Sequence, residues 1–416
     1  MLEVCKWVLM AGSVVCFLWA AFQMLRRWVC EPPLPLAESE QPTRRELLTV
    51  AAAVLAVALA YQAVLFTGAQ LRAPDATLRD AVTQFFYGNT DAKHYIHLAE
   101  YGYGAGEEFP EQYLMIVFFP MFPVLLRWLN PLGLLDWGMV AIAVQPALLC
   151  WAGVNLYCLV RRSYGQSAAR WTLAFLLVSP AAFYYAVPMT ESLFLALSTG
   201  YILCLEEDRP KTAALLGLLA ALTRSPGGLL FGVAFVWLVQ RALRGGQWPK
   251  PAQIVAMLTP VAGLGLYFLL NWRVYGVWNQ YAVYQKEHWH QALGLFPNTI
   301  AYHWEYMQSW WASSPDLSIY LCLTAVLCIV IAVALLTLAA KRLAVHHLAY
   351  GLAYVVVTMG VTWLISGPRY AVALFPLPLS IALLTRKRPV RVAVWLLLAV
   401  CGGFYLRAYL TGGPIY

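Results

Sequence analysis

The sequence predicts an all-α, multi-pass membrane protein, a helical bundle with about twelve membrane segments. Hydrophobic residues make up 61% of the chain and charged residues only 12%, whereas soluble domains carry about 25% charged residues. The apolar residues also come in runs of roughly 17 to 25, the length that crosses a hydrocarbon core of about 30 Å. Composition and run length therefore point to the same class.

The first apolar run, 7–25, is too long for the apolar region of a signal peptide and lacks a clean Ala-x-Ala cleavage site, so we interpret it as a retained span. The expected spans are 7–25, 47–67, 134–160, 171–187, 192–205, 212–222, 230–240, 252–271, 317–340, 345–365, 371–385 and 392–410.

Basic residues cluster in the short links between these segments, and twelve crossings put every such cluster on one side, which the positive-inside rule makes cytoplasmic. The net charge of +8 is then a topological signal rather than a nucleic-acid footprint. The agreement requires that 113–129, with Pro120, Pro123 and Arg127, does not cross, so we expect an interfacial or re-entrant helix there. A re-entrant pair is also expected around Arg224, within 212–240, because its flanking segments are short.

This topology divides the chain into three parts. Residues 1–46 form an N-terminal anchor helix and cytoplasmic linker, 47–272 a central membrane module, and 273–416 a C-terminal helical module. Long extracytoplasmic loops are expected at 68–133, bearing interfacial helices, and at 273–316. The nine cysteines are scattered without a Cys-x-x-Cys spacing, so we expect free thiols rather than a disulfide framework or a zinc site.

Asp91 lies in a polar stretch of the first long loop, ahead of the helix-compatible run 92–101. One interpretation is an N-cap, formed by either Thr90 or Asp91. The other is a general base, because a carboxylate at the bilayer edge can take a proton from an attacking hydroxyl. His94 follows three residues later and can share the same helix face, where it would bind a phosphate or a sugar hydroxyl or make an ordinary polar contact.

Three further charges belong to short turns on the same predicted face. Glu191 either caps the helix that follows or serves a functional site, since a carboxylate at the end of two spans is costly unless wet or paired. Arg224 interrupts an apolar stretch ahead of two glycines and suits a phosphate or ion-pair role. Arg369, followed by Tyr370, is likewise on the side where a topogenic arginine is not expected.

The stretch 271–316, which includes the second long loop, contains six tryptophans. They form either an aromatic belt at the membrane interface or a surface that stacks against sugar rings. They are Trp272, Trp278, Trp289, Trp304, Trp310 and Trp311. Its histidines, His288, His290 and His303, fit no recognised metal spacing.

Four segments in order resemble the PIG-V family of mannosyltransferases, members of the GT-C glycosyltransferase superfamily. They are Asp91-Ala92-Lys93-His94-Tyr95 with Leu98 to Tyr103, Phe118-Phe119-Pro120-Met121-Phe122-Pro123, Thr190-Glu191-Ser192-Leu193-Phe194, and Thr223-Arg224-Ser225-Pro226-Gly227. The resemblance covers about residues 85–230, and beyond it mainly Arg369-Tyr370. Thr90 stands where the family often has Trp, and Pro226 where it often has Asn, which leaves the sugar and the acceptor open.

The resemblance implies a GT-C-like bundle in which 47–272 is the catalytic module and Asp91 the general base. It implies a polyprenyl-phosphate-sugar donor whose phosphate lies near Arg224 and Arg369, a glycolipid or glycan acceptor, inversion at the anomeric carbon, and no required metal or cofactor. His94, Glu191 and Tyr370 would assist substrate binding. The short loops favour a prokaryotic plasma membrane over the endoplasmic reticulum, with the site on the extracytoplasmic or lumenal face.

Two other classes remain open. About twelve spans is also typical of a transporter or a flippase for a lipid-linked sugar, although such folds usually carry internal repeats and charged groups near the midplane. A non-catalytic subunit of a glycosylation complex is the other alternative, in which Asp91 would not be needed for transfer.

Overall fold

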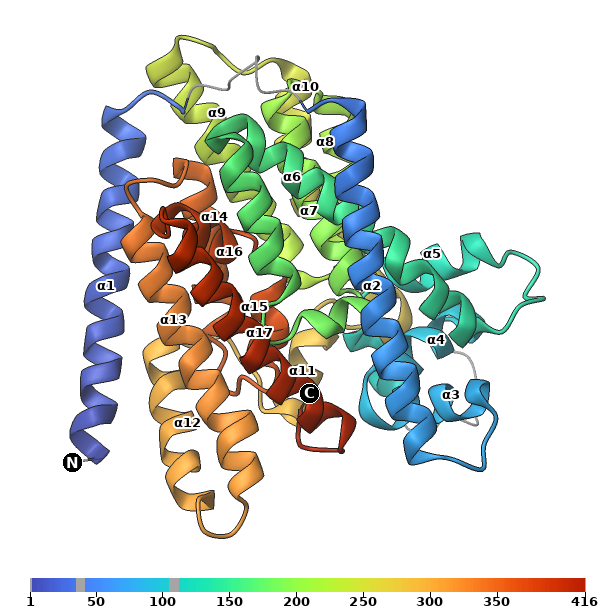
Figure 1. The fold of residues 1–416 in the computed structure, drawn as a ribbon. Coiled ribbons are helices and arrows are strands. Elements are labelled where there is room, and N and C mark those ends of the chain that lie inside the picture. The colour runs from blue at the N-terminus through green and yellow to red at the C-terminus, as the bar shows by residue number, and fades with distance from the viewer. Residues whose placement is uncertain (1, 35–41, 105–111, 416) are drawn as a thin grey trace.

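The computed structural model describes residues 2–34, 42–104 and 112–415, which fold into a bundle of helices (Figure 1). In those ranges the β pairing is limited to one isolated bridge, between Leu293 and Val361, so the all-α prediction is confirmed. Linker residues 35–41 and loop residues 105–111 lie outside the described ranges. The elements are α1 (Leu2–Cys30), α2 (Arg44–Arg72), α3 (Leu78–Asn89), α4 (Ala92–Tyr101), η2 (Gln112–Val117), α5 (Met121–Leu129), α6 (Trp137–Leu177), η3 (Ala182–Ala186), α7 (Glu191–Glu206), α8 (Pro210–Ala221), η4 (Ser225–Leu229), α9 (Leu230–Gly245), α10 (Pro251–Tyr275), α11 (Gln280–Trp289), α12 (Phe296–Trp310), η5 (Leu317–Leu323), α13 (Thr324–Ala339), α14 (Val345–Tyr354), η6 (Val355–Met359), α15 (Gly367–Val372), α16 (Pro376–Leu384) and α17 (Arg388–Leu410).

Within the described part of the chain, seven helical stretches are long and apolar enough to cross a membrane, as expected of a membrane-embedded protein. These stretches are Glu3–Cys30, Arg44–Arg72, Trp137–Leu177, Ser225–Gly245, Pro251–Tyr275, Leu317–Ala339 and Arg388–Leu410. The remaining expected segments correspond to the shorter helices α7, α8, α14 and α16 and to the second part of α6. That part begins after Gly165, where a φ of 82° breaks the helix at a conformation that favours glycine.

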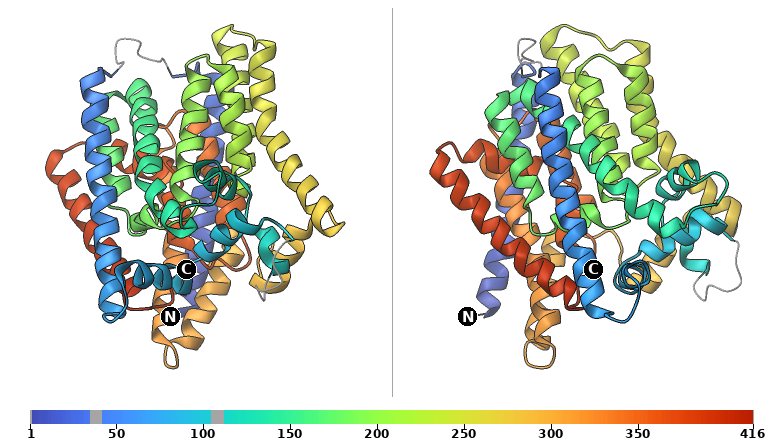
Figure 2. Two further views of the ribbon diagram at one scale, coloured as in Figure 1. Left: turned by 90° about the vertical axis from the view of Figure 1, so that its right-hand side faces the viewer. Right: turned by 45° about the vertical axis from the view of Figure 1, so that its right-hand side comes forward.

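The two ends of the bundle differ. The last turn of α1, the first turn of α2 and the α9–α10 connection lie at the upper end in Figure 1, whereas α3, α4, α11 and α12 gather toward the lower end. Figure 2 shows α17 crossing the bundle obliquely and α3–α5 projecting from one side. The expected non-crossing segment 113–129 forms η2 and the nine-residue α5, whose rise of about 13 Å is far short of a bilayer.

Helix α7 occupies the centre of the bundle. All 16 of its residues are buried, and it packs between α6 and α8. A helix that is apolar all round needs neighbours on every side, so α7 is a core element rather than a lipid-facing one. Its first and last residues, Glu191 and Glu206, are both acidic, and each has a basic partner from elsewhere in the chain.

The turn after α8 depends on Gly227. The segment folds back so closely that a Cβ on Gly227 would collide with the backbone of Ala220. The backbone N–H of Gly227 donates to Arg224 O at 2.9 Å, which closes the turn that presents Arg224. The first of the two glycines after Arg224 therefore allows the two backbone segments to approach this closely.

Replacing Gly227 by Ala should lower stability by about 1–3 kcal/mol, because the added methyl must push two backbone segments apart. Thermal unfolding of the purified protein in detergent measures the change. Gly232→Ala is the matched control, since a Cβ on Gly232 of α9 meets nothing within 4 Å. Equal unfolding temperatures for the two variants would contradict the packing argument.

Candidate functional site

Asp91 lies at the junction between α3 and α4, and its side chain does not cap α4. The hydroxyl of Thr90 does so instead, accepting the Ala92 N–H at 3.1 Å while donating to Phe86 O at 2.8 Å. The Asp91 carboxylate accepts a hydrogen bond from Arg369 Nη1 at 2.9 Å and keeps 41% of its side chain exposed. Thr90 therefore supplies the side-chain contact at the start of α4, and the Asp91 carboxylate pairs with Arg369 instead.

Glu191 is the first residue of α7, and none of its side chain is exposed. One oxygen, Oε1, accepts from Arg224 Nη1 at 2.7 Å and from Arg369 Nε at 2.6 Å. Its position in the first helical turn also favours a negative charge. The other oxygen, Oε2, has no hydrogen-bond partner among the described residues. Pairing with two cations, rather than capping, accounts for this buried carboxylate.

The two arginines that pair with Glu191 both follow it in the sequence but belong to different elements. Arg224 belongs to the turn between α8 and η4, and its guanidinium carbon lies 5.4 Å from the centre of the Tyr370 ring. Arg369 belongs to the short helix α15, and its guanidinium carbon lies 5.7 Å from the Tyr184 ring. Aromatic faces near a guanidinium stabilise its charge away from water.

The four charged groups form one chain, in the order Asp91, Arg369, Glu191 and Arg224. Two carboxylates and two guanidinium groups alternate in sign, so the chain carries no net formal charge. Only its Asp91 end is substantially exposed, since the two arginine side chains are 9–10% exposed. The buried end holds the arginines in place, and the exposed end offers a carboxylate to a ligand.

A cavity of about 1220 Å³ opens beside this chain. Of the predicted site residues, the structure places Asp91, His94, Arg224, Arg369 and Tyr370 around it. Glu191 does not line the cavity but sits behind the two arginines. The volume exceeds the range of about 300–1,000 Å³ typical of sites for one small molecule.

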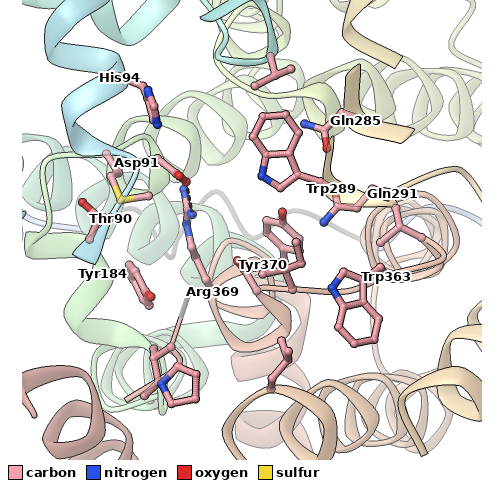
Figure 3. Close-up of a pocket in the computed structure, with 18 of the residues that line it drawn as sticks. Thr90, Asp91, His94, Tyr184, Gln285, Trp289, Gln291, Trp363, Arg369 and Tyr370 are labelled. Carbon is pink, nitrogen blue, oxygen red and sulfur yellow. Dashed lines mark hydrogen bonds and ion pairs between the residues drawn. The ribbon is translucent and has the colours of Figure 1, made fainter. Parts of the chain in front are cut away.

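His94 projects from α4 beside Asp91 (Figure 3). Its ring stacks on Phe118, with the centroids 4.5 Å apart and the planes 18° from parallel. Tyr103 donates a short hydrogen bond to Phe118 O. The Phe-Phe-Pro segment noted in the sequence therefore holds the histidine at the cavity.

Opposite Asp91, the cavity has an uncharged wall formed by Gln285, Trp289, Gln291 and Trp363, hereafter the amide–tryptophan wall (Figure 3). Sequence reasoning identified Trp289 only as one of several loop tryptophans and did not single out the other three. The available signal was weak, because Gln285 and Gln291 belong to no motif. Their placement between tryptophans in the second long loop was the one indication.

A second buried cluster lies away from the cavity. Glu206, at the end of α7, accepts a hydrogen bond from His346 Nε2 at 2.8 Å and pairs with His347 Nε2 at 3.3 Å. The candidate ligand atoms of the three residues lie within 4.8 Å of one another, so they could hold a metal ion. This cluster is not among the sites that the sequence motifs predicted. Adjacent histidines in an apolar run were the only signal for it.

The chain matches no protein-family model and no curated protein. The resemblance described above therefore rests on the sequence motifs alone.

His303 supports the amide–tryptophan wall from behind. Its ring stacks on Trp363 with the centroids 4.4 Å apart and the planes 10° from parallel. Its Nε2 accepts the Leu364 N–H at 2.9 Å, so the folded protein uses the neutral ring. Burial lowers the pKa of the His303 imidazole to about 4.

Glu191→Gln should destabilise the fold by about 3–5 kcal/mol, because the amide removes the counter-charge of the buried Arg224 and leaves the buried Arg369 with Asp91 alone. The unfolding temperature in detergent measures the loss. Glu305→Gln is the matched control: Glu305 is 56% exposed and pairs with Lys6 at the surface, where a pair contributes about 0–1 kcal/mol. A shift for Glu191→Gln no larger than that of the control would refute the counter-charge role.

Stability should fall as the pH is lowered from about 6.5 to about 4, and His303 should contribute to this fall. The unfolded imidazole binds a proton near pH 6.5 and the folded one only near pH 4, so the unfolded state gains protons first. Unfolding temperatures measured at pH 7 and pH 4.5 test this. His303→Gln keeps an acceptor for Leu364 N–H but does not titrate, so its pH dependence should be smaller. An unchanged dependence would remove His303 as a contributor.

Proposed function

We propose that the chain is an inverting, polyprenyl-phosphate-sugar-dependent glycosyltransferase of the mannosyltransferase kind. It would transfer a hexose from a lipid-phosphate donor to a glycolipid or glycan acceptor. The observation that carries the proposal is the Asp91 carboxylate, exposed at a cavity that Arg224 and Arg369 also line. A base beside two phosphate-binding cations is what transfer from a sugar phosphate to a hydroxyl requires.

In this reaction Asp91 accepts the proton of the acceptor hydroxyl as its oxygen forms a bond to the anomeric carbon of the donor. The bond from that carbon to the phosphate oxygen breaks, and its electron pair leaves with the lipid phosphate. One direct displacement inverts the anomeric centre. The leaving group is an anionic phosphate ester, and the N–H groups of Arg224 and Arg369 would stabilise it where a metal ion could otherwise act.

Arg369 would couple donor binding to the activity of the base. It holds Asp91 through Nη1 and Glu191 through Nε. A donor phosphate competes with Asp91 for Nη1, while Glu191 keeps the guanidinium in place through Nε. Loss of the Arg369 contact leaves that Asp91 oxygen available to accept a hydrogen bond from the acceptor hydroxyl once the donor is bound.

The basic clusters favour a cytoplasmic side opposite the candidate site. The donor lipid chain would lie among the helices, with its phosphate at the arginines. We expect the transfer to take place at the extracytoplasmic face of a prokaryotic plasma membrane, or in the lumen if the membrane is that of the endoplasmic reticulum.

Asp91→Asn should reduce sugar transfer by about 10²–10⁴-fold, because the amide cannot take the proton. The assay follows labelled sugar from polyprenyl-phosphate-mannose into acceptor lipids or glycans in membranes containing the protein. Asp316→Asn is the control, since Asp316 lines the same cavity and has no role in the proposed reaction. Undiminished transfer by Asp91→Asn would exclude it as the base, and no donor consumption by the wild type would argue against the enzyme class.

A further inference from the structure

The cavity has two chemically different sides. Around Asp91, Arg224 and Arg369 the lining is charged, as a phosphate requires. The amide–tryptophan wall on the other side carries no charged group (Figure 3). The remaining acid of the lining, Asp316, precedes η5 and is not part of this wall. A second substrate bound against the wall therefore meets amides and aromatic rings rather than ions.

The amides of this wall are available to a ligand. Among the described residues, the side chains of Gln285 and Gln291 have no protein hydrogen-bond partner, although both residues line the cavity. Each amide offers two donors and an oxygen acceptor. That combination matches neighbouring hydroxyl groups, each of which both donates and accepts. It gives no advantage to a phosphate, which lacks donors when fully ionised.

The aromatic members are held in place by neighbouring segments. Trp363 stacks on the buried His303, and Trp289 ends α11. Backbone pairing joins the two segments that carry the wall: Gly294 N–H donates to Gly360 O, and Thr362 N–H donates to Ala292 O, both at 2.9 Å. An aromatic surface fixed in this way loses little entropy on binding, and it suits the apolar C–H face of a sugar ring.

The wall is also continuous with the catalytic side. The segment that pairs with the α11–α12 connection leads directly into α15, which carries Arg369. The cavity volume of about 1220 Å³ leaves room for a sugar ring here while a sugar phosphate occupies the arginine side. The two binding surfaces face one another across the position where transfer would occur.

We propose that Gln285, Trp289 and Gln291 bind the uncharged terminal sugar of the acceptor and direct its hydroxyl toward Asp91. This inference rests on the proposed function and specifies its acceptor class: a neutral hexose at the end of a glycan or glycolipid, rather than an anionic headgroup. The tryptophan stacks on the ring, and the two amides bind its hydroxyl groups.

The test measures binding rather than transfer. Full-length protein carrying Asp91→Asn, in lipid nanodiscs, is titrated with α-mannobiose and with its 6-phosphate, and saturation-transfer NMR gives the two dissociation constants. We expect the neutral sugar to bind more tightly. Adding Trp289→Ala or Gln291→Leu should weaken its binding about tenfold, while Trp278→Ala should not, because Trp278 is 60% exposed and does not line the cavity.

Tighter binding of the phosphorylated sugar, no binding of either sugar, or equal binding by the Trp289 and Trp278 variants would overturn the inference. Transfer kinetics of the same substitutions in the otherwise wild-type protein give a second readout. The acceptor KM should rise about tenfold with the donor KM unchanged. If the wild-type protein consumes no donor, this result would count against the proposed function alone. The binding titration does not require turnover and still tests the acceptor site.

Discussion

The carboxylate of Glu191 is the contact on which the candidate site depends. It is buried at the start of α7 and accepts hydrogen bonds from Arg224 and Arg369, which lie 33 and 178 residues further along the chain. Without this partner the buried Arg224 would lose its counter-charge and Arg369 would keep only the partly exposed Asp91, and an unpaired buried charge is strongly unfavourable. One carboxylate therefore joins the central helix, the turn after α8 and the short helix α15 at a single point.

Opposite charges alternate from Asp91 through Arg369 and Glu191 to Arg224, so each charged group fixes the position of the next. Glu191 fixes Arg369, and Arg369 in turn orients Asp91 at the cavity edge. The interior end of the chain is rigid and the exterior end is accessible to a ligand. This arrangement suits a site whose cations must be in place before the substrate arrives, since preorganised charges need no reorganisation during the reaction.

The sequence predicted which polar residues gather, but not how they pair. For both Asp91 and Glu191 the sequence left a helix cap and a functional role open, because a carboxylate near the start of a helix looks the same whether its partner is local or distant. Thr90 satisfies the cap at α4, which leaves Asp91 for Arg369. The helical class followed from hydropathy alone. The sequence predicted two separate segments, 134–160 and 171–187, with Gly165 in the link between them. The structure shows that this link is a single break at Gly165, whose positive φ interrupts α6.

Other features could not have been found from one sequence. The contact of Glu206 with His346 spans 140 residues, and no local spacing records it. Gln285 and Gln291 belong to no sequence motif, and only the structure shows that both line the cavity. Such features arise from tertiary packing, whereas periodicity and motifs report on neighbours along the chain.

The burial of α7 bears on which sequence changes the protein can tolerate. A spanning helix with a lipid-facing side can exchange one apolar residue for another there, because lipid chains adapt to its shape. Helix α7 has no such side, and even Gly200 faces Asn155 so closely that a Cβ would lie 2.8 Å from its amide nitrogen. With an acidic residue held at each end, the helix has neither free surface nor freedom to shift. Substitutions should therefore accumulate in the helices around α7 and not within it.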